Sequence, residues 1–521
     1  MSPMQFRQRF DRLTRDGLFD AANTLLADWC KQMPRAFEPR FHQVQLELQR
    51  GRYRVAREAA VAVLAHAECP PQMALDVALC LRSFSLHDPL IAWAARYPFR
   101  SKMPAADIAH AATLLSAVGA HRLALDWANQ AVASNPADPV GRFNRALILN
   151  YLGDSDRAAS ELEGLLKRTP PVAMAYWLLS RLKRQTAASN HVDAIQSALA
   201  TPRLAASDRA FLGYALFKEL DDLGEISAAW EALSAASAAA RIDRPYHRAS
   251  EEQLFAALRR TFPLAEPTPT AVSADTTPIF IVGLHRSGTS LIERMLGASS
   301  QVHDAGETDR FAAAIRDGAD RVYQQVPEPA LLVETGRIDF ARARATFDAS
   351  AHHQSGGRRF VTEKAPANFL NIGLIRHALP HARILHMRRD PIDLCFANYR
   401  EMFGASVSHT YALDDLVHYH ELYRGLMRHW HEHYPGFILD IDYENLVRHP
   451  ERESRRVFDF CGLEWHAGVV DVQARAQAPV ATLSSVQVRQ PVSTASIGRW
   501  RPYARWLGTL TEAFPPDDAA D

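Results

Sequence analysis

A glycine recurs at multiples of 34 residues in the first third of the chain, and an alanine follows each glycine at the same distance. The glycines are Gly17, Gly51, Gly119 and Gly153, and the alanines five positions later are Ala22, Ala56, Ala124 and Ala158. A period of this length is typical of a helix, a tight turn at the glycine and a second helix, with a small residue where the two helices approach closely. The sequence therefore predicts a stack of antiparallel helix pairs.

The gap between Gly51 and Gly119 holds a degenerate copy, with Ser85 and Leu90 in the places of the glycine and the alanine. Prolines that would end the second helix follow three of the glycines at the same distance; they are Pro34, Pro136 and Pro170. The register then slips, but residues 211–233 read as one more helix pair, with Gly224 and Ala229 again five positions apart.

The clearest copy is DPVGRFNRALILNYLGDSDRAASELEGLLKRTP, residues 138–170. Its Ala146, Gly153, Ala158 and Pro170 resemble the tetratricopeptide (TPR) pattern, while the plainer alternative is a generic alanine-rich helical bundle. Stacked helix pairs of this kind present a concave surface that binds peptides or proteins, so we expect a partner on this part of the chain.

The bulk composition narrows the class of protein. The 521 residues are 47% apolar and carry 59 basic and 59 acidic side chains, which favours a globular chain with no general attraction to nucleic acid or to an anionic membrane. No apolar run approaches the ~18 residues of a membrane span, and the N-terminus lacks the apolar stretch of a secretion signal. The scattered cysteines without a CxxC motif predict a reducing compartment, by default the cytoplasm. They are Cys30, Cys69, Cys80, Cys395 and Cys461.

The stretch PIFIVGLHRSGTSLIERML, residues 278–296, reads as a buried strand, a glycine turn and a helix that begins near residues 287–289. The free N–H groups and the positive dipole of such a helix start attract an anion. Candidate anion-binding residues in the turn are Arg286, Ser287, Gly288, Thr289 and Ser290. A nucleotide-triphosphatase loop would have a lysine where Thr289 stands, so a triphosphate hydrolase is disfavoured.

A second apolar strand, in RILHMRRDPIDLCFANYREMF (residues 383–403), carries Arg388 and Arg389 at its carboxyl end, and Asp390 and Pro391 open a helix after it. Ligands of parallel sheets bind outside the carboxyl ends of the strands, so the two strand ends predict a guest with two separated anionic groups.

The predicted fold is multidomain. Residues 1–262 form an all-α helical-repeat (TPR-like) solenoid, and the proline- and threonine-rich residues 263–277 form a linker. Residues 278–521 form an α/β domain of the P-loop-like type with a central parallel sheet.

The pair GLHRSGTSLIERML and RRDPIDLCFANY resembles the two cofactor motifs of sulfotransferases, over residues 278 to about 510. With the repeats in front, the chain is similar to bacterial tetratricopeptide-repeat sulfotransferases, with a catalytic part like that of protein-tyrosine sulfotransferases. The resemblance implies 3′-phosphoadenosine 5′-phosphosulfate (PAPS) as co-substrate and no metal. The first motif would hold its 5′-phosphosulfate, and Arg389 of the second its 3′-phosphate.

The same resemblance assigns the catalytic residues. Gly306 and Glu307 match a Gly-Glu pair that supplies the base in tyrosylprotein sulfotransferases, and Lys364 matches a lysine that reaches the transferring group. Arg286 would act beside Lys364, and the base in other branches is a histidine, which leaves His303 as the alternative. Lesser roles fall to Arg310, which would orient an acidic acceptor, and to Asn368, which would position the substrate or Lys364.

Three further residues are expected at the nucleotide: Tyr443, Ser484 and Arg499. One departure from the family stands eight positions after Arg389, where Ala397 replaces a serine that donates to the 3′-phosphate. Neither Phe396 nor Asn398 is expected to replace that donor, so weaker cofactor binding is expected.

The predicted reaction is sulfuryl transfer from PAPS to an acceptor hydroxyl, with protein or peptide tyrosine favoured. The alternatives are a P-loop kinase-like phosphotransferase, against which the missing lysine argues, and a catalytically weak repeat scaffold, which Ala397 favours. His429 and His433 stand one helical turn apart, but they flank an amphipathic stripe, and no metal site is expected there.

Overall fold

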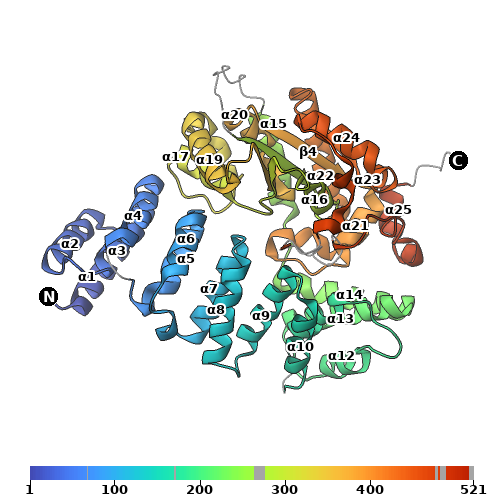
Figure 1. Cartoon of the computed structure of the whole chain (residues 1–521), viewed down its shortest axis with the longest axis horizontal. Coiled ribbons are helices and arrows are strands. Elements are labelled where there is room, and N and C mark those ends of the chain that lie inside the picture. The colour runs from blue at the N-terminus through green and yellow to red at the C-terminus, as the bar shows by residue number, and fades with distance from the viewer. Residues whose placement is uncertain (67–68, 169–171, 263–275, 476–478, 481–488, 516–521) are drawn as a thin grey trace. The chain divides into compact units, whose positions relative to one another are not determined.

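The computed structural model describes residues 1–66, 69–168, 172–262, 276–475, 479–480 and 489–515 (Figure 1). Its contacts divide the chain into two compact units. The first unit holds residues 1–141 together with 309–350, and the second holds residues 142–308 together with 351–521.

The first unit is helical in its described residues, and consecutive helices lie side by side in Figure 1. Its repeat helices are α1 (Pro3–Arg15), α2 (Phe19–Gln32), α3 (Glu38–Gln49), α4 (Tyr53–His66), α5 (Ala74–Ser83), α6 (His87–Arg96), α7 (Ala105–Ala117) and α8 (His121–Ser134). Three later helices complete the unit; they are α17 (Arg310–Ala319), α18 (Pro329–Val333) and α19 (Phe340–Ser355), whose last turn passes beyond residue 350.

The glycine–alanine repeat has the structural role that its period predicts. Each repeat glycine adopts a positive φ, from 71° at Gly17 to 89° at Gly153, and each partner alanine is fully buried. The degenerate copy keeps the same turn, because Ser85 has φ 52° and Leu90 is fully buried. Helix pairs with a 34-residue period are therefore confirmed, whereas the assignment to the tetratricopeptide class stays a prediction, and Pro170 lies outside the described residues.

The second unit begins with helices and continues into the sheet. The helices are α9 (Pro139–Leu152), which starts at the unit boundary, α10 (Ser155–Leu166), α11 (Ala173–Leu182), α12 (Val192–Leu199), α13 (Ala206–Leu223), α14 (Ile226–Asp243) and α15 (Arg248–Thr261). Helices α13 and α14 form the helix pair predicted around Gly224, which has φ 82°, and Ala229 is fully buried between them.

The described residues form one five-stranded parallel sheet in the order β2-β3-β1-β4-β5. The strands are β1 (Thr277–Gly283), β2 (Val302–His303), β3 (Phe360–Lys364), β4 (Arg383–Arg388) and β5 (Ile438–Asp442). Short apolar runs form these strands because both faces of the sheet are covered. On one face Leu385 and Met387 pack with α16 (Thr289–Leu296) and α24 (Pro450–Cys461), and on the other His386 contacts Tyr423 of α22 (Leu413–His433).

The predicted change from helices to a parallel sheet is confirmed, since α15 ends at Thr261 and β1 starts at Thr277. Most of the predicted linker, residues 263–275, lies outside the described residues. The contacts group residues 142–262 with the sheet, and the boundaries at 262 and 278 remain a prediction about the chain's organisation. In the part of the chain that is described, no helix is both long and apolar enough to cross a bilayer.

Candidate active site

The strand ends meet as the sequence predicts. Strand β1 lies between β3 and β4, with Ile281 opposite Lys364 and Gly283 opposite Met387. The loop after β1, the end of β3 and the loop after β4 therefore share one edge of the sheet, where parallel-sheet proteins hold their ligands.

The loop after β1 is built around two glycines in conformations that other residues rarely adopt. Gly283 has φ 149°, and a Cβ there would lie 2.6 Å from the carbonyl oxygen of Met387. Gly288 has φ 104°, and a Cβ there would lie 2.6 Å from the ring of Tyr443. Between them Arg286 has φ 66°, an uncommon value for a residue with a side chain. This backbone brings the start of α16 to Thr289, where the apolar spacing predicted it.

The geometry of this loop fits an anionic guest. The Ser287 hydroxyl is fully buried and has no hydrogen-bond partner in the described part of the chain, although buried polar atoms are rarely left without one. Residues Thr289 and Ser290 form the first turn of α16, whose N–H groups have no acceptor within a helix. Both features suit a phosphate or sulfate group.

Arg389 joins the two motifs. Its Nη1 donates to the carbonyl oxygen of Arg286 at 3.0 Å, its Nη2 donates to that of Ser496 at 2.7 Å, and its guanidinium lies 4.8 Å from the Tyr443 ring centre. Its buried Nε has no hydrogen-bond partner among the described residues. The structure thus brings Arg389 and Tyr443 to the glycine loop, and their role toward a second anionic group stays a prediction.

Arg286 is almost buried, with 11% of its side chain exposed, and Glu401 lies 3.6 Å from its Nη2. Burial lowers the pKa of Arg286 to about 10, against the opposing charge of Glu401. The other oxygen of Glu401 pairs at 2.6 Å with Arg181, which comes from α11. A buried cation of this kind gains from any anion that reaches it.

The two predicted catalytic residues meet directly. Lys364 Nζ donates to Glu307 Oε1 at 2.6 Å, and the Lys364 backbone N–H donates to the carbonyl oxygen of Gly306 at 3.1 Å. The Lys364 side chain is fully buried, whereas 52% of the Glu307 side chain is exposed. An acceptor can therefore approach the carboxylate from solvent while the ammonium faces the interior.

Two carboxylates that sequence reasoning missed fix the residues on either side of Glu307. Glu293 of α16 accepts from the Gly306 N–H at 3.0 Å and from Thr362 Oγ1 at 2.9 Å, and burial raises its pKa. Glu363 of β3 accepts from Thr308 Oγ1 at 2.5 Å. Their positions in the sequence could have indicated a structural role. One glutamate stands beside apolar residues of a short helix and the other inside a buried strand, and glutamates are rarely buried without a partner.

A histidine lies near the candidate base, but it is His285 of the glycine loop. Burial lowers the pKa of His285, while the charge of Glu307 acts in the opposite direction. The predicted alternative base, His303, ends the edge strand β2. Arg310 opens α17, which belongs to the other compact unit, so its expected role at the acceptor stays a prediction.

Two predicted nucleotide residues are not seen at the site. Ser484 lies outside the described residues. Arg499 Nη2 pairs at 3.0 Å with Asp221 of α13, and no contact between Arg499 and Arg389 or the glycine loop is found among the described residues. Both assignments stay predictions.

The helix after β4, α21 (Pro391–Tyr399), explains the surroundings of Ala397. Asn398 Nδ2 donates to the carbonyl oxygen of His285 at 2.7 Å, so this residue holds the glycine loop rather than facing a phosphate beside Arg389. Asn368, expected to help position the substrate or Lys364, accepts from Asn371 Nδ2 at 3.1 Å, and its expected role stays a prediction. The expected loss of one donor at Ala397 stays a prediction.

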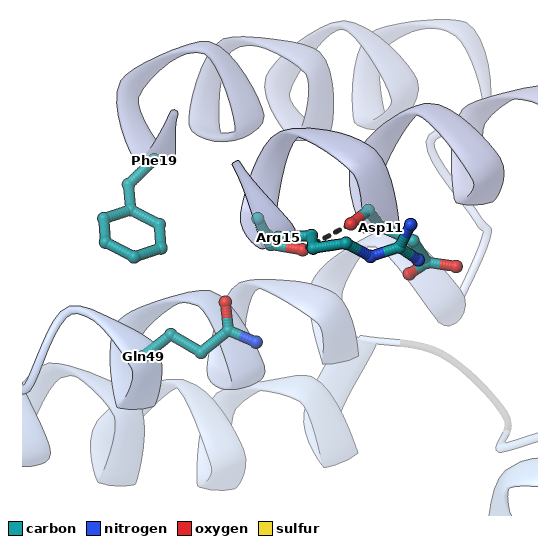
Figure 2. A pocket seen from close by; sticks show the side chains of 5 residues that line it. Asp11, Arg15, Phe19 and Gln49 are labelled. Carbon is teal, nitrogen blue, oxygen red and sulfur yellow. Dashed lines mark hydrogen bonds between the residues drawn. The ribbon is translucent and has the colours of Figure 1, made fainter. Parts of the chain in front are cut away.

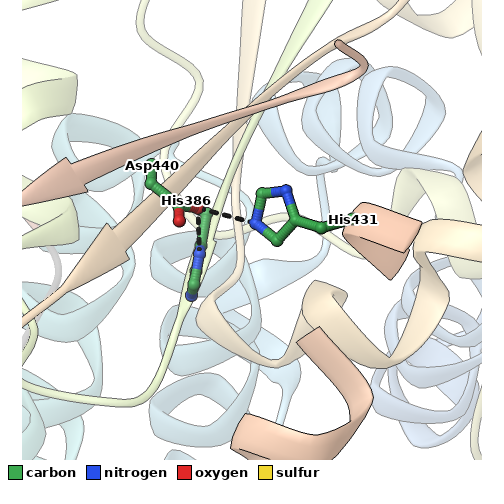
Figure 3. Close-up of side chains that lie close together, drawn as sticks. All are labelled: His386, His431 and Asp440. Carbon is green, nitrogen blue, oxygen red and sulfur yellow. Dashed lines mark hydrogen bonds and ion pairs between the residues drawn. The ribbon is translucent and has the colours of Figure 1, made fainter. Parts of the chain in front are cut away.

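Three potential metal ligands gather on the sheet face that packs against α22 (Figure 3). His386 Nδ1 and His431 Nε2 lie 2.7 and 2.9 Å from the same oxygen of Asp440, and Arg388 contacts the other oxygen at 3.3 Å. Burial alone would raise the pKa of Asp440, but hydrogen bonds from both histidines hold it well below its usual range. Hydrogen bonds account for each of these atoms, and the neighbouring guanidinium disfavours a cation.

The histidine pair considered from the sequence makes backbone contacts instead. His429 Nε2 lies 2.8 Å from the carbonyl oxygen of Phe262, and His433 Nδ1 lies 2.8 Å from that of His429. The first helices carry a shallow hollow of about 450 Å³ (Figure 2). Its lining residues, Asp11, Thr14, Arg15, Phe19 and Gln49, do not form a recognisable catalytic set.

The paired strand ends bring candidate anion donors to one side and a lysine–carboxylate pair to the other, an arrangement that suits group transfer. Comparison with known proteins specifies the class. The family model described as "Sulfotransferase family" matches residues 278–467. This part of the chain is therefore a sulfotransferase-family domain.

The chain is also similar to individual proteins over part of its length. An uncharacterised protein of Aquifex aeolicus is 29% identical over 381 residues, which cover 70% of this chain and 49% of that protein, so the chain spans about half the length of this relative. Protein-tyrosine sulfotransferase 1 of Danio rerio is 26% identical over 279 residues, which cover 49% of this chain and 75% of that one. The sulfotransferase domain of the Synechococcus PCC 7002 olefin synthase matches with 16% identity and a TM-score of 0.32, covering 47% of this chain and 96% of that one.

Proposed function

We propose that the protein transfers a sulfuryl group from PAPS to an acceptor hydroxyl. The observation that carries this proposal is the 2.6 Å pair between Glu307 and Lys364 at the edge of the sheet where the anion loop opens. A carboxylate that accepts a proton, next to a buried ammonium and an anion cradle, is the set of groups that such a transfer needs.

The donor's binding groups are assigned to the two motifs. The buried Ser287 hydroxyl and the first turn of α16, with Thr289 and Ser290, would hold the 5′-phosphosulfate. Arg389, with its unpaired buried Nε and its stacked Tyr443, would hold the 3′-phosphate. Bound there, the donor would supply the sulfuryl group of a phosphoric–sulfuric anhydride, and its leaving group would be a phosphate.

The residues of this chain have three tasks in the reaction. Glu307 takes the proton of the acceptor hydroxyl, because it is the partly exposed member of the pair. Lys364 and Arg286, both nearly buried, stabilise the negative charge that develops on the leaving phosphate oxygen. Glu293 and Glu363 keep the loop around Glu307 in place through its two neighbours.

The acceptor favoured by this proposal is a tyrosine hydroxyl in a peptide or protein. Several relatives are named protein-tyrosine sulfotransferases, among them those of Danio rerio and Caenorhabditis elegans. Helical repeats of the tetratricopeptide type would offer a peptide-binding surface. A cytoplasmic location is part of the proposal, since all five cysteines are free thiols in the structure.

Transfer of labelled sulfate from PAPS to proteins and peptides of a cell extract tests the proposal. Glu307→Gln and Lys364→Ala are each expected to lower the labelling rate by about 100-fold or more, the usual contribution of a general base or a charge-stabilising group. Glu163→Gln and Lys167→Ala, both exposed on or just after α10, are the matched controls and should keep full activity. Transfer of phosphate from ATP with magnesium, without sulfate transfer, would favour the kinase-like alternative and overturn the proposal.

A further inference from the structure

A single buried carboxylate is shared by two arginines beside the anion loop. Glu401 follows α21, and only 5% of its side chain is exposed. Its Oε2 lies 2.6 Å from Arg181 Nη1, and its Oε1 lies 3.6 Å from Arg286 Nη2. Arg181 comes from α11, whereas Arg286 belongs to the loop after β1, which is assigned to the sulfuryl donor. A protein carboxylate thus already stands at a guanidinium that the ligand needs.

The two distances differ in a way that matters for ligand binding. A nitrogen–oxygen separation of 2.6 Å is that of a close ion pair, whereas 3.6 Å is longer than a hydrogen bond. Burial alone would raise the pKa of Glu401, but the charges of Arg181 and then Arg286 hold it below its usual value, so the group is a carboxylate at neutral pH. Glu401 is therefore tightly paired with Arg181 and only loosely paired with Arg286.

Backbone contacts hold Glu401 within reach of the anion loop. The Glu401 N–H donates to the carbonyl oxygen of Asn398 at 3.0 Å. Asn398 Nδ2 in turn donates at 2.7 Å to the carbonyl oxygen of His285, the residue before Arg286. The end of α21 is thus tied to the loop one position from the arginine, and the carboxylate remains a neighbour of that arginine.

The charges around this contact favour an anionic ligand. Asp221 of α13 is shared in the same way as Glu401, because its Oδ2 lies 3.3 Å from Arg400 Nη2 and 3.0 Å from Arg499 Nη2. In these contacts two carboxylates face four guanidinium groups. Partly buried cations in excess attract an anion, and Glu401 is the negative group that such an anion meets at Arg286.

We infer that Glu401 competes with the bound nucleotide for Arg286, and that Arg181 sets the strength of this competition. In the unliganded chain, the Glu401 carboxylate compensates the charge of Arg286, as an oxyanion of the ligand does after binding. The ligand then takes over Arg286, while Glu401 keeps its close pair with Arg181. Glu401 is thus a positioning residue that acts through Arg286 and weakens retention of the desulfated nucleotide. The inference rests on the proposed function.

The test measures the affinity of the full chain for 3′-phosphoadenosine 5′-phosphate by calorimetric titration. Glu401→Gln keeps the size of the side chain and removes its charge, so it should tighten binding by about tenfold, within the range of close charge pairs. Glu401→Asp keeps the charge and should stay within about twofold of the wild type. In turnover, Glu401→Gln should lower the KM for PAPS without raising kcat. A residue that merely supports the fold around Arg286 would lose affinity when neutralised.

A double-mutant cycle supplies an independent test of the role of Arg181. Arg181→Leu should weaken nucleotide binding by about fivefold in the otherwise wild-type chain, because Glu401 then pairs with Arg286 alone. In the Glu401→Gln background, the same change should alter the affinity by less than about twofold, since no carboxylate is left to compete. An equal loss in both backgrounds would overturn the inference.

The matched control is Glu219→Gln, which neutralises a fully buried glutamate of α13 in the same unit. Glu219 accepts from the His191 N–H at 2.5 Å, and no contact between Glu219 and the anion loop is found among the described residues. This control should leave nucleotide affinity unchanged. Equal tightening by Glu219→Gln or by Glu401→Asp, or no tightening by Glu401→Gln, would also overturn the inference. Failure of the wild type to bind the nucleotide would instead contradict the proposed function, so the two failures are distinguishable.

Discussion

Two parts of the molecule use the same helix-pair device and differ in what surrounds it. In the first unit, the turn at Gly17 has φ 71° and Ala22 is fully buried; in the second, the turn at Gly224 has φ 82° and Ala229 is fully buried. The pair α13–α14, however, shares a hydrophobic core with α21, α22 and α25 (Gly508–Ala513) of the second unit. The Tyr214 hydroxyl, for example, donates to the carbonyl oxygen of Tyr399 at 3.2 Å.

The polar contacts show the same difference. Asp221 of α13 accepts from Arg400 and Arg499 and from the Tyr503 hydroxyl at 2.7 Å. In the stacked ring pair of Trp230 and Trp506, the ring centres lie 5.4 Å apart. The glycine–alanine signature therefore specifies how a helix pair closes on itself, whereas the outer surface of the pair decides whether it packs against the helices around the sheet.

The greatest loss of activity should follow from changing the proposed catalytic pair, Glu307 and Lys364, both of which belong to the second unit. Lys364→Ala should lower the transfer rate by about 10²–10⁴-fold, because a buried cation that stabilises the leaving group is lost. Turnover measured with labelled PAPS checks this. A Lys364→Ala chain with more than half of the wild-type rate would contradict the assignment.

Both units contain an aspartate whose pKa is held below its usual range by a histidine, against the opposing effect of burial: Asp309 with His87, and Asp440 with His386 and His431. A depressed carboxyl pKa adds stability that is complete above the unfolded value of about 3.9 and is lost as pH falls below it. Asp440→Asn should therefore lower the free energy of unfolding by about 2 kcal/mol at pH 7.

The same variant should flatten the dependence of stability on pH between about pH 5 and pH 2. Asp309→Asn is the matched change in the first unit, and it should lower the stability of that unit without altering transfer at pH 7. Denaturant unfolding across this pH range provides the measurement. An Asp440→Asn chain with an unchanged pH dependence would show that the histidine contacts do not stabilise the carboxylate.

A larger side chain placed in the helix pair around Gly17, or in the pair α13–α14, distinguishes the structural roles of the two pairs. Ala22→Leu and Ala229→Leu each place a larger side chain at a fully buried position and should destabilise the chain by about 1–3 kcal/mol. Because α14 packs with the sulfotransferase-family domain, Ala229→Leu alone should also weaken nucleotide binding, as titration with 3′-phosphoadenosine 5′-phosphate would show. Equal nucleotide affinity in both variants would remove the distinction between the two helix pairs.

Arg181 links α11 to the anion loop through Glu401, and its effect should be moderate. Arg181→Leu is expected to weaken the binding of 3′-phosphoadenosine 5′-phosphate by about fivefold. Without Arg181, the Glu401 carboxylate has Arg286 as its remaining partner at that side, and this pairing competes with the nucleotide for Arg286. Arg184→Leu, three positions later and outside this chain of contacts, should leave nucleotide affinity unchanged. The reverse order of effects would contradict the link.

The smallest expected effect concerns the degenerate repeat. Ser85 has φ 52°, a conformation that glycine adopts without strain, so Ser85→Gly should stabilise the first unit by up to about 1 kcal/mol. A rise in the thermal midpoint without a change in transfer rate is the expected observation. A fall in stability would mean that the Ser85 side chain contributes more than its backbone strain costs.

The features predictable from the sequence are those with a local signal. The start of α16 at Thr289 follows from the apolar spacing of one short segment, and the turn at Ser85 follows from its place in the 34-residue repeat. Glu401 and Arg181 escaped prediction because they lie 220 positions apart and meet through folding, and neither belongs to a recognised motif. No local pattern in the sequence indicates the ion pair between these two residues.

The most direct test of the central claim is a titration of the full chain with 3′-phosphoadenosine 5′-phosphate, the desulfated product of the proposed donor. We predict one bound molecule per chain, with the affinity lowered at least about tenfold in both Arg286→Ala and Arg389→Ala, because each removes a charged contact to a different anionic group. No binding, or equal affinity in the wild type and both variants, would contradict the claim that the two strand ends form one nucleotide site.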